Sequence, residues 1–273
     1  MSSSPAWNEA SIACGCAEAL PARIYRPTDV AAASAPLVLH LHGGAFVGGD
    51  LEAGRTVAAL IADAGAVVVS LDYPLAPDHP FPQAIEAVHA AADWAMRHRR
   101  RLAGAQSPLF VAGEEAGGNL AAAAALMARD RHGPDLAGQI LLSPMLDVCV
   151  GTASLRGAHA GPVGCAWADG WRQYLPRASD ALHPYAAPAS SMRLEGLPPT
   201  LLVTADDDPL RDETRAYAQR LRDAGVTVDE AVVPAVTGWP RSYRSPAAPA
   251  APWPAMVSRR LQRFLSQHAT AAA

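Results

Sequence analysis

A glycine-flanked pentapeptide with a carboxylate at its centre, Gly113-Glu114-Glu115-Ala116-Gly117, is the most chemically informative part of this chain of 273 residues. It has the form of G-x-S-x-G, the sharp turn between a strand and a helix that presents a nucleophilic serine, but Glu115 stands in place of that serine. A carboxylate at such a tip can transfer protons, act as a nucleophile, or bind the N–H groups that open the helix. Which of these it does depends on the groups that face it.

The segments around Glu115 predict the strand and the helix that such a turn needs. Residues 107–112 form a short apolar run, and residues 118–130 form an alanine-rich, helix-favouring stretch. Further strands are expected at 37–41, 66–71, 139–142 and 200–204, and further helices at 55–64, 84–96, 213–223 and 256–267. This alternation predicts an α/β fold with a mainly parallel central sheet and helices on both faces.

Length and composition favour one domain over residues 1–273, because 50% hydrophobic residues can fill one large core. Residues 150–199 break the alternation with loops around an aromatic helix at 167–175, which we interpret as a cap insertion beside the site. Residues 234–254 are rich in proline and are expected to form an irregular loop.

Charge and cysteine content argue against several classes of partner. The net charge of −4 makes nucleic acid an unexpected partner. The polar start, residues 1–5, precedes no long apolar segment, so we expect no signal peptide, no membrane span and a cytoplasmic location. Cys14, Cys16, Cys149 and Cys165 include no second pair at metal-ligand spacing, so reduced thiols are expected, with no metal and no cofactor.

Four blocks follow one another in a familiar order. They are His42-Gly43-Gly44-Ala45, the run from Asp72 to Pro82, the pentapeptide around Glu115, and the run from Asp208 to Glu213. With these blocks the chain resembles the bacterial hormone-sensitive-lipase-like branch of the α/β-hydrolases, from about Ala22 to the last helix. The resemblance implies an eight-stranded sheet and a Ser, Asp, His triad acting on esters of short acyl chains.

Carried over residue by residue, the resemblance assigns Gly43 and Gly44 as oxyanion-hole donors, Ala116 as a third donor and Asp208 as the triad acid. The other two triad members are missing. Glu115 replaces the serine, and Thr237 lies in the block where the histidine is expected. Thr237 and Trp239 are predicted to bind substrate. Family members usually carry a longer segment before the first block, so a reduced cap is expected.

Without a serine and an imidazole, the usual route of ester hydrolysis is lost, and three hypotheses stay open. In the first, Glu115 beside Asp208 serves as general acid/base of a non-hydrolytic tailoring enzyme. Such an enzyme would catalyse elimination or dehydration, isomerisation or cyclisation of a small hydrophobic oxygenated substrate. A small molecule is then the expected partner, together with a second copy of the chain in a homodimer.

The second hypothesis is a non-catalytic binding or partner protein in which Glu115 plugs the oxyanion hole. It predicts two or more backbone N–H groups bonded to Glu115 and no open pocket beside it. The third is a residual carboxylesterase with a surrogate base, for which His40, His42 and His159 are the nearest candidates in the sequence.

Overall fold

The structure is a computed structural model that describes residues 5–13, 15, 19–27, 35–158, 162–244 and 251–269. The expectations for Cys14, Cys16 and His159 lie outside the described residues. The same holds for residues 245–250 of the expected irregular loop.

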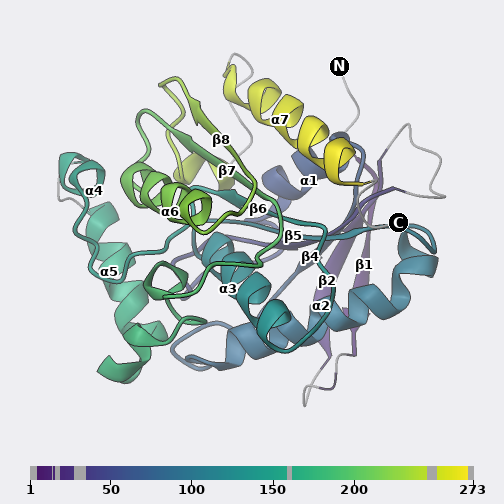
Figure 1. Ribbon diagram of the computed structural model, residues 1–273, viewed down its shortest axis with the longest axis horizontal. Helices are drawn as coiled ribbons and strands as arrows, with labels where there is room; N and C mark the ends of the chain where they lie inside the picture. The colour runs from purple at the N-terminus through teal and green to yellow at the C-terminus, as the bar shows by residue number, and fades with distance from the viewer. Residues whose placement is uncertain are drawn as a thin grey trace.

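An eight-stranded sheet forms the centre of the molecule, with the strand order β1-β2-β4-β3-β5-β6-β7-β8 (Figure 1). Strands β3 to β8 run parallel, and β2 pairs antiparallel with both β1 and β4. This confirms the α/β fold with a mainly parallel sheet. The strands are β1 (Trp7–Ile12), β2 (Leu20–Tyr25), β3 (Leu37–Leu41), β4 (Val67–Leu71), β5 (Leu109–Glu114), β6 (Gly138–Leu142), β7 (Thr200–Ala205) and β8 (Val228–Val233).

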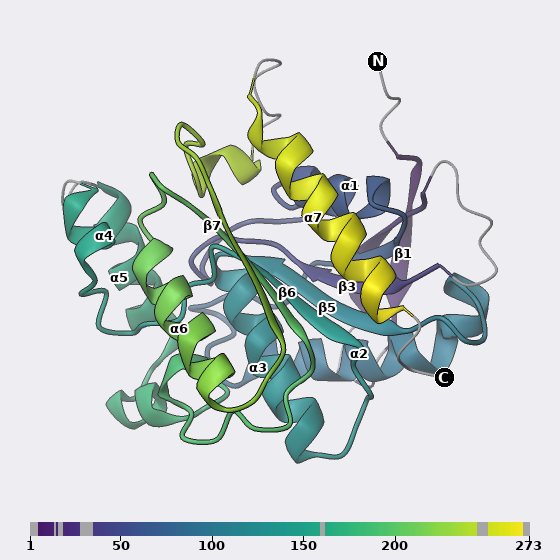
Figure 2. The same ribbon diagram turned by 45° about the horizontal axis from the view of Figure 1, so that its top comes forward.

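Helices cover both faces of the sheet, as expected (Figure 2). Apolar side chains of α1 and α7 pack on one face, and those of α2, α3 and α6 pack on the other. The helices are α1 (Arg55–Asp63), α2 (Gln83–Leu102), α3 (Ala116–Asp130), α4 (Ala153–Gly157), α5 (Pro162–Tyr174), α6 (Arg211–Asp223) and α7 (Trp253–His268), with short 3₁₀ helices η1 (Ala178–Leu182), η2 (Pro188–Ser190) and η3 (Arg241–Arg244).

The segment between β6 and β7 carries α4, α5, η1 and η2. Helix α5 turns an aromatic face inward, where Trp171 and Tyr174 lie 4.9 and 4.0 Å from the ring centre of Phe46. Trp167, one turn earlier on the same face, is 3% exposed. The segment is therefore packed on the body of the protein beside the loop that follows β3.

The parallel strands bring the predicted site residues to one edge of the sheet. Gly43 and Gly44 follow β3, Glu115 follows β5, and Asp208 follows β7. Because the carboxyl ends of parallel strands lie at the same edge, these residues gather above it, where open α/β sheets commonly bind ligands.

Candidate functional site

Glu115 sits at a strained turn between β5 and α3. Its backbone has φ 53° and ψ −117°, a left-handed conformation that non-glycine residues adopt only where the surroundings impose it. The flanking glycines make the turn possible, because a Cβ at Gly113 would lie 2.2 Å from the Gly117 carbonyl oxygen, and one at Gly117 would lie 2.0 Å from the Leu41 carbonyl oxygen. The expected order of strand, sharp turn and helix is thus present.

Donors from three distant segments meet the Glu115 carboxylate. The Gly44 N–H donates to Oε2 at 2.7 Å, the indole Nε1–H of Trp167 donates to Oε1 at 2.6 Å, and Arg244 Nη2 donates to Oε2 at 3.1 Å. The side chain does not cap α3, although it stands at the helix N-terminus. Glu115 is 4% exposed, so its charge is neutralised inside the protein rather than by water.

Glu114, one residue earlier, occupies the other N–H group of the same loop. The Gly43 N–H donates to Glu114 Oε1 at 3.1 Å, and His40 Nε2 lies 2.8 Å from Oε2. A Cβ at Gly43 would lie 2.6 Å from Glu115 Oε2, so a glycine is needed there for the carboxylate to approach the loop. The N–H groups of Gly43 and Gly44, in the loop formed by residues 42–45 that is here called the oxyanion loop, therefore both point at carboxylates.

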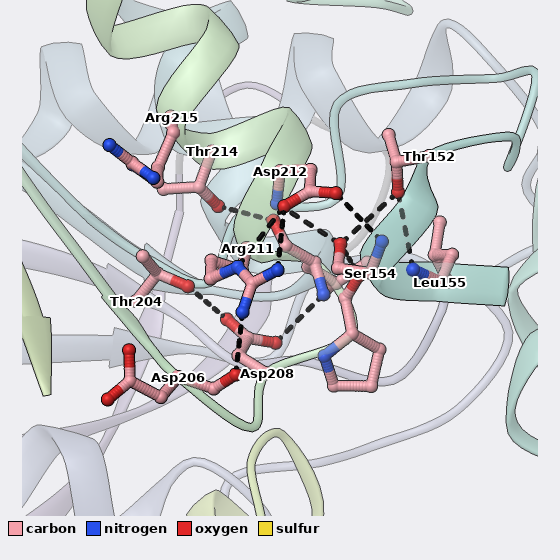
Figure 3. Close-up of polar contacts among 12 residues, drawn as sticks. Thr152, Ser154, Leu155, Thr204, Asp206, Asp208, Arg211, Asp212, Thr214 and Arg215 are labelled. Carbon is pink, nitrogen blue, oxygen red and sulfur yellow. Dashed lines mark hydrogen bonds and ion pairs between the residues drawn. The ribbon is translucent and has the colours of Figure 1, made fainter. Parts of the chain in front are cut away.

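Asp208 is buried and held by its own surroundings. Thr204 Oγ1 donates to Oδ2 at 2.6 Å and the Leu210 N–H donates to Oδ1 at 2.9 Å (Figure 3). Burial raises the pKa of the Asp208 carboxyl, and hydrogen bonds from Ser143, Thr204 and the Leu210 N–H offset only part of this rise. Among the described residues, these contacts do not join Asp208 directly to Glu115.

Two successive residues of the short helix η3, Tyr243 and Arg244, connect the carboxylates of Asp208 and Glu115. Arg244 binds Glu115, and the Tyr243 hydroxyl lies 3.0 Å from Ser143 Oγ, which in turn hydrogen-bonds Asp208. Burial raises the pKa of the Tyr243 phenol well above its usual value, and the nearby Asp208 raises it further. Tyr243 therefore stays a hydrogen-bond donor at neutral pH.

Neither η3 residue was among the predicted site residues, because the sequence placed them in an irregular loop. One signal could have found Arg244. A buried carboxylate needs a cation, and the two arginines of Arg241-Ser-Tyr-Arg244 follow directly on the block where the histidine is missing.

Thr237 and Trp239 lie away from the Glu115 carboxylate contacts. The N–H and hydroxyl of Thr237 donate to the Asp207 carboxylate at 2.7 and 2.8 Å. Burial raises the pKa of Asp207, but hydrogen bonds from the following loop outweigh it and lower the pKa below its usual value. Trp239 packs in an aromatic cluster, 4.8 Å from Tyr243 and 5.4 Å from Trp253, on the α1 and α7 face. Their substrate-binding roles stay predictions.

Ala116 is buried and is the first residue of α3, so its role as a third donor also stays a prediction. His42 stacks on Tyr73 at 4.4 Å, and its Nδ1 lies 2.9 Å from the Gly43 carbonyl oxygen. The part of the chain that the structure describes contains no group of three or more His, Cys, Asp or Glu side chains placed to hold a metal. None of its described helices has the length and apolar content needed to cross a membrane.

The chain is similar to known esterases in sequence. The carboxylesterase NlhH of Mycobacterium tuberculosis is 36% identical over 222 residues, which is 77% of this chain and 67% of that protein. Esterase LipI of the same organism is 39% identical over 212 residues, 76% of this chain and 66% of the relative. The chain thus matches about two thirds of the length of these curated relatives.

Solved structures agree with the sequence comparison. A hyperthermophilic esterase from the archaeon Pyrobaculum calidifontis has a TM-score of 0.82 and 33% identity, covering 98% of this chain and 87% of its own. A thermostable esterase from Pseudomonas putida has a TM-score of 0.84 and 30% identity, with coverages of 98% and 84%. A family model for the α/β-hydrolase fold matches residues 38–237, so Tyr243 and Arg244 lie beyond the matched part. This chain belongs to the α/β-hydrolase fold family, in its hormone-sensitive-lipase-like esterase branch.

Proposed function

We propose that this chain is a non-hydrolytic member of the esterase family, a binding or partner protein in which the Glu115 carboxylate plugs the oxyanion loop. One observation carries the proposal. A single buried carboxylate accepts hydrogen bonds from the Gly44 N–H, the Trp167 indole and the Arg244 guanidinium. Backbone N–H groups at such a loop stabilise the oxygen of an ester only if that oxygen can reach them. Here two carboxylates of the protein occupy that place.

The plug differs in one respect from its expected form. A second backbone donor was expected on Glu115, but the Gly43 N–H binds Glu114 instead. Side-chain donors from the cap helix and from η3 complete the shell around Glu115. The effect on the loop is the same, because the N–H groups of Gly43 and Gly44 are both bound by carboxylates.

The histidines near the site do not support a surrogate base. Both ring nitrogens of His40 are engaged, by Ser70 at 2.9 Å and by Glu114 at 2.8 Å. His42 stacks on Tyr73 and contacts its own loop through Nδ1, while its buried Nε2 lies 3.7 Å from Asp72 Oδ1 and contacts neither carboxylate oxygen of Glu115. Among the described residues, the donors around the Glu115 carboxylate include no imidazole. These contacts favour the plug over a residual carboxylesterase with a surrogate base.

A second candidate function keeps Glu115 as a general acid/base. This is the tailoring enzyme for elimination, dehydration, isomerisation or cyclisation of a small hydrophobic oxygenated substrate. One observation favours it: the Arg244 side chain is 45% exposed, so its rotation into solvent would uncover Glu115. The hydrogen-bonded chain of Tyr243, Ser143 and Asp208 would then supply the second carboxylate for proton transfer.

Hydrolysis of p-nitrophenyl acetate and butyrate tests the proposal. We expect no rate above buffer for the wild type, because carboxylates bind the N–H groups of Gly43 and Gly44. We expect none for Glu115→Ser, because among the described residues no imidazole contacts the Glu115 side chain and could activate a serine there. A wild-type rate that Glu115→Gln abolishes would refute the plug. A cytoplasmic location and a small-molecule or homodimer partner remain part of the proposal.

A further inference from the structure

A cavity outside the Glu115 site shares one residue, Arg244, with that site. We propose that this outer cavity binds a small aromatic carboxylate. The cavity measures about 230 Å³ and lies between β1, β2, α1 and η3, with Trp7, Tyr25, Arg55 and Arg244 among its walls. Figure 2 shows α1, which supplies part of the wall, lying between α7 and β1. Arg244 thus reaches the buried Glu115 and also forms part of the outer wall.

Two guanidinium groups supply the recognition of a negative charge. The side chains of Arg55 and Arg244 are 53% and 45% exposed, and each makes one ion pair, with Glu52 at 2.9 Å and with Glu115 at 3.1 Å. A guanidinium carries five N–H donors in a planar fork, so each has donors left for a second carboxylate.

The acidic residues of the wall do not cancel this attraction. Glu52 is already bound by Arg23 at 2.7 Å as well as by Arg55, and these two hydrogen bonds lower its pKa. Asp63 is the other acid, and burial raises its pKa. A ligand carboxylate is therefore expected at the Arg55 and Arg244 side of the cavity, away from Asp63.

The remaining wall suits a single flat ring. Trp7 is 42% exposed, and the Arg23 guanidinium covers one face of its ring at 4.2 Å. Leu60 and Pro254 add apolar surface. A cavity of about 150 Å³ accommodates benzene, so about 230 Å³ holds one ring with a carboxylate and excludes a second ring.

A buried hydroxyl at the cavity points to a ligand with an acceptor. Tyr25 is 1% exposed, and its hydroxyl oxygen is hydrogen-bonded to the Arg23 guanidinium. Because a guanidinium can only donate, the O–H of Tyr25 is left without an acceptor among the described residues. Burial raises the pKa of this phenol, although Arg23 lowers it in part, so the group remains a donor at neutral pH. A buried donor without a partner is costly, and a ligand carboxylate would satisfy it.

Benzoate is the probe for the full-length protein, titrated by calorimetry and by ligand-observed NMR. Benzoate is expected to bind at least tenfold more tightly than benzamide, because only benzoate carries the charge that the arginines recognise. Tyr25→Phe is expected to weaken benzoate about tenfold, since it removes one hydrogen bond to a charged group. Ala59→Phe, which fills the cavity from α1, is expected to abolish binding.

The matched control is Tyr217→Phe, which removes a buried tyrosine hydroxyl that also lacks an acceptor but lies outside this cavity. It should leave benzoate binding unchanged. Equal binding of benzoate and benzamide, or unchanged binding in a folded Tyr25→Phe, would mean an adventitious additive only and would overturn the proposal. So would the lack of binding at 10 mM benzoate, on the order of the weakest specific affinities.

One consequence rests on the proposed function and has its own test. Because Arg244 serves both carboxylates, Glu115→Gln should tighten benzoate binding several-fold. If Glu115 does not hold Arg244, benzoate will bind the wild type and Glu115→Gln equally, while the effects of Tyr25→Phe and Ala59→Phe persist. Failure of the plug is thereby distinguished from failure of the outer cavity.

Discussion

Replacing Glu115 with glutamine removes the charge from the elbow while preserving the size of the side chain. Three donors converge on the carboxylate, with Gly44 and Arg244 on Oε2 and Trp167 on Oε1. An amide offers one acceptor oxygen and an NH₂ group. Whichever way it is turned, at least one of the three donors then faces another donor. We therefore expect Glu115→Gln to destabilise the folded state.

The magnitude follows from the burial of each partner. A buried donor left without an acceptor costs about 1–3 kcal/mol, and Trp167 and Gly44 are both buried. Loss of the ion pair adds about 1 kcal/mol rather than the larger value of a fully buried pair, because water can hydrate the 45% exposed Arg244. The sum is about 2–4 kcal/mol, a fall in Tm on the order of 10 °C for a domain of this size.

Urea denaturation followed by circular dichroism measures this difference. Glu195→Gln is the matched control, since it makes the same chemical change at an exposed position and should stay within about 0.5 kcal/mol of the wild type. Equal stability of Glu115→Gln and the control would refute the plug. A gain in stability would favour the proton-transfer enzyme instead, because catalytic groups are commonly held at a cost to stability.

Three further predictions concern the site and its surroundings. Glu115→Ala should lose stability and regain part of it in about 50 mM acetate, because acetate can enter the vacated space and stabilises the folded state that binds it. A thermal melt measures this. Asp207→Asn should raise proteolysis at the loop of Thr237, since Asp207 accepts three hydrogen bonds there. Burial raises the pKa of Glu213 well above its usual value, so the wild type should lose more stability than Glu213→Gln as the pH rises above about 4.

Each of these predictions has a control. If acetate stabilises the wild type as much as it stabilises Glu115→Ala, the stabilisation is a general salt effect and acetate does not occupy the vacated space. For the loop, Asp206→Asn is the neighbouring substitution, because the Asp206 side chain is exposed and should leave the cleavage pattern unchanged. For Glu213, the unfolded chain releases its proton near pH 4.3 while the folded chain retains it, so the folded state is disfavoured only above that pH. Parallel pH profiles of wild type and Glu213→Gln would contradict the assignment.

The fold could be predicted from the sequence wherever strands are buried on both faces. Residues 37–41 and 66–71 read as continuous apolar runs and correspond to β3 and β4. Strands β1, β2 and β8 were missed, because they lie at or near the sheet edges and mix exposed with buried residues, as in the polar run Trp7–Ile12. Helix α2 also extends to Leu102, beyond the expected end at Met96, because the arginine cluster belongs to its last turns.

The site could be predicted only in part. The spacing of glycines placed Glu115 at the turn, because that depends on neighbouring residues. Its partners could not be found this way, since Trp167 and Arg244 lie 52 and 129 residues further along the chain. Such contacts depend on how the sheet brings distant segments together, and local sequence patterns do not reveal that arrangement.

The mutual dependence of Glu115 and Arg244 also bears on how this sequence can change over generations. A single exchange of Glu115 for serine leaves the Arg244 guanidinium and the Gly44 N–H without the anion that both bind. A single exchange of Arg244 leaves a buried negative charge without its cation. A change back to serine at position 115 that alters one of the two residues at a time therefore produces a less stable protein. Selection for folding alone is then enough to preserve the pair, whether or not any reaction depends on it.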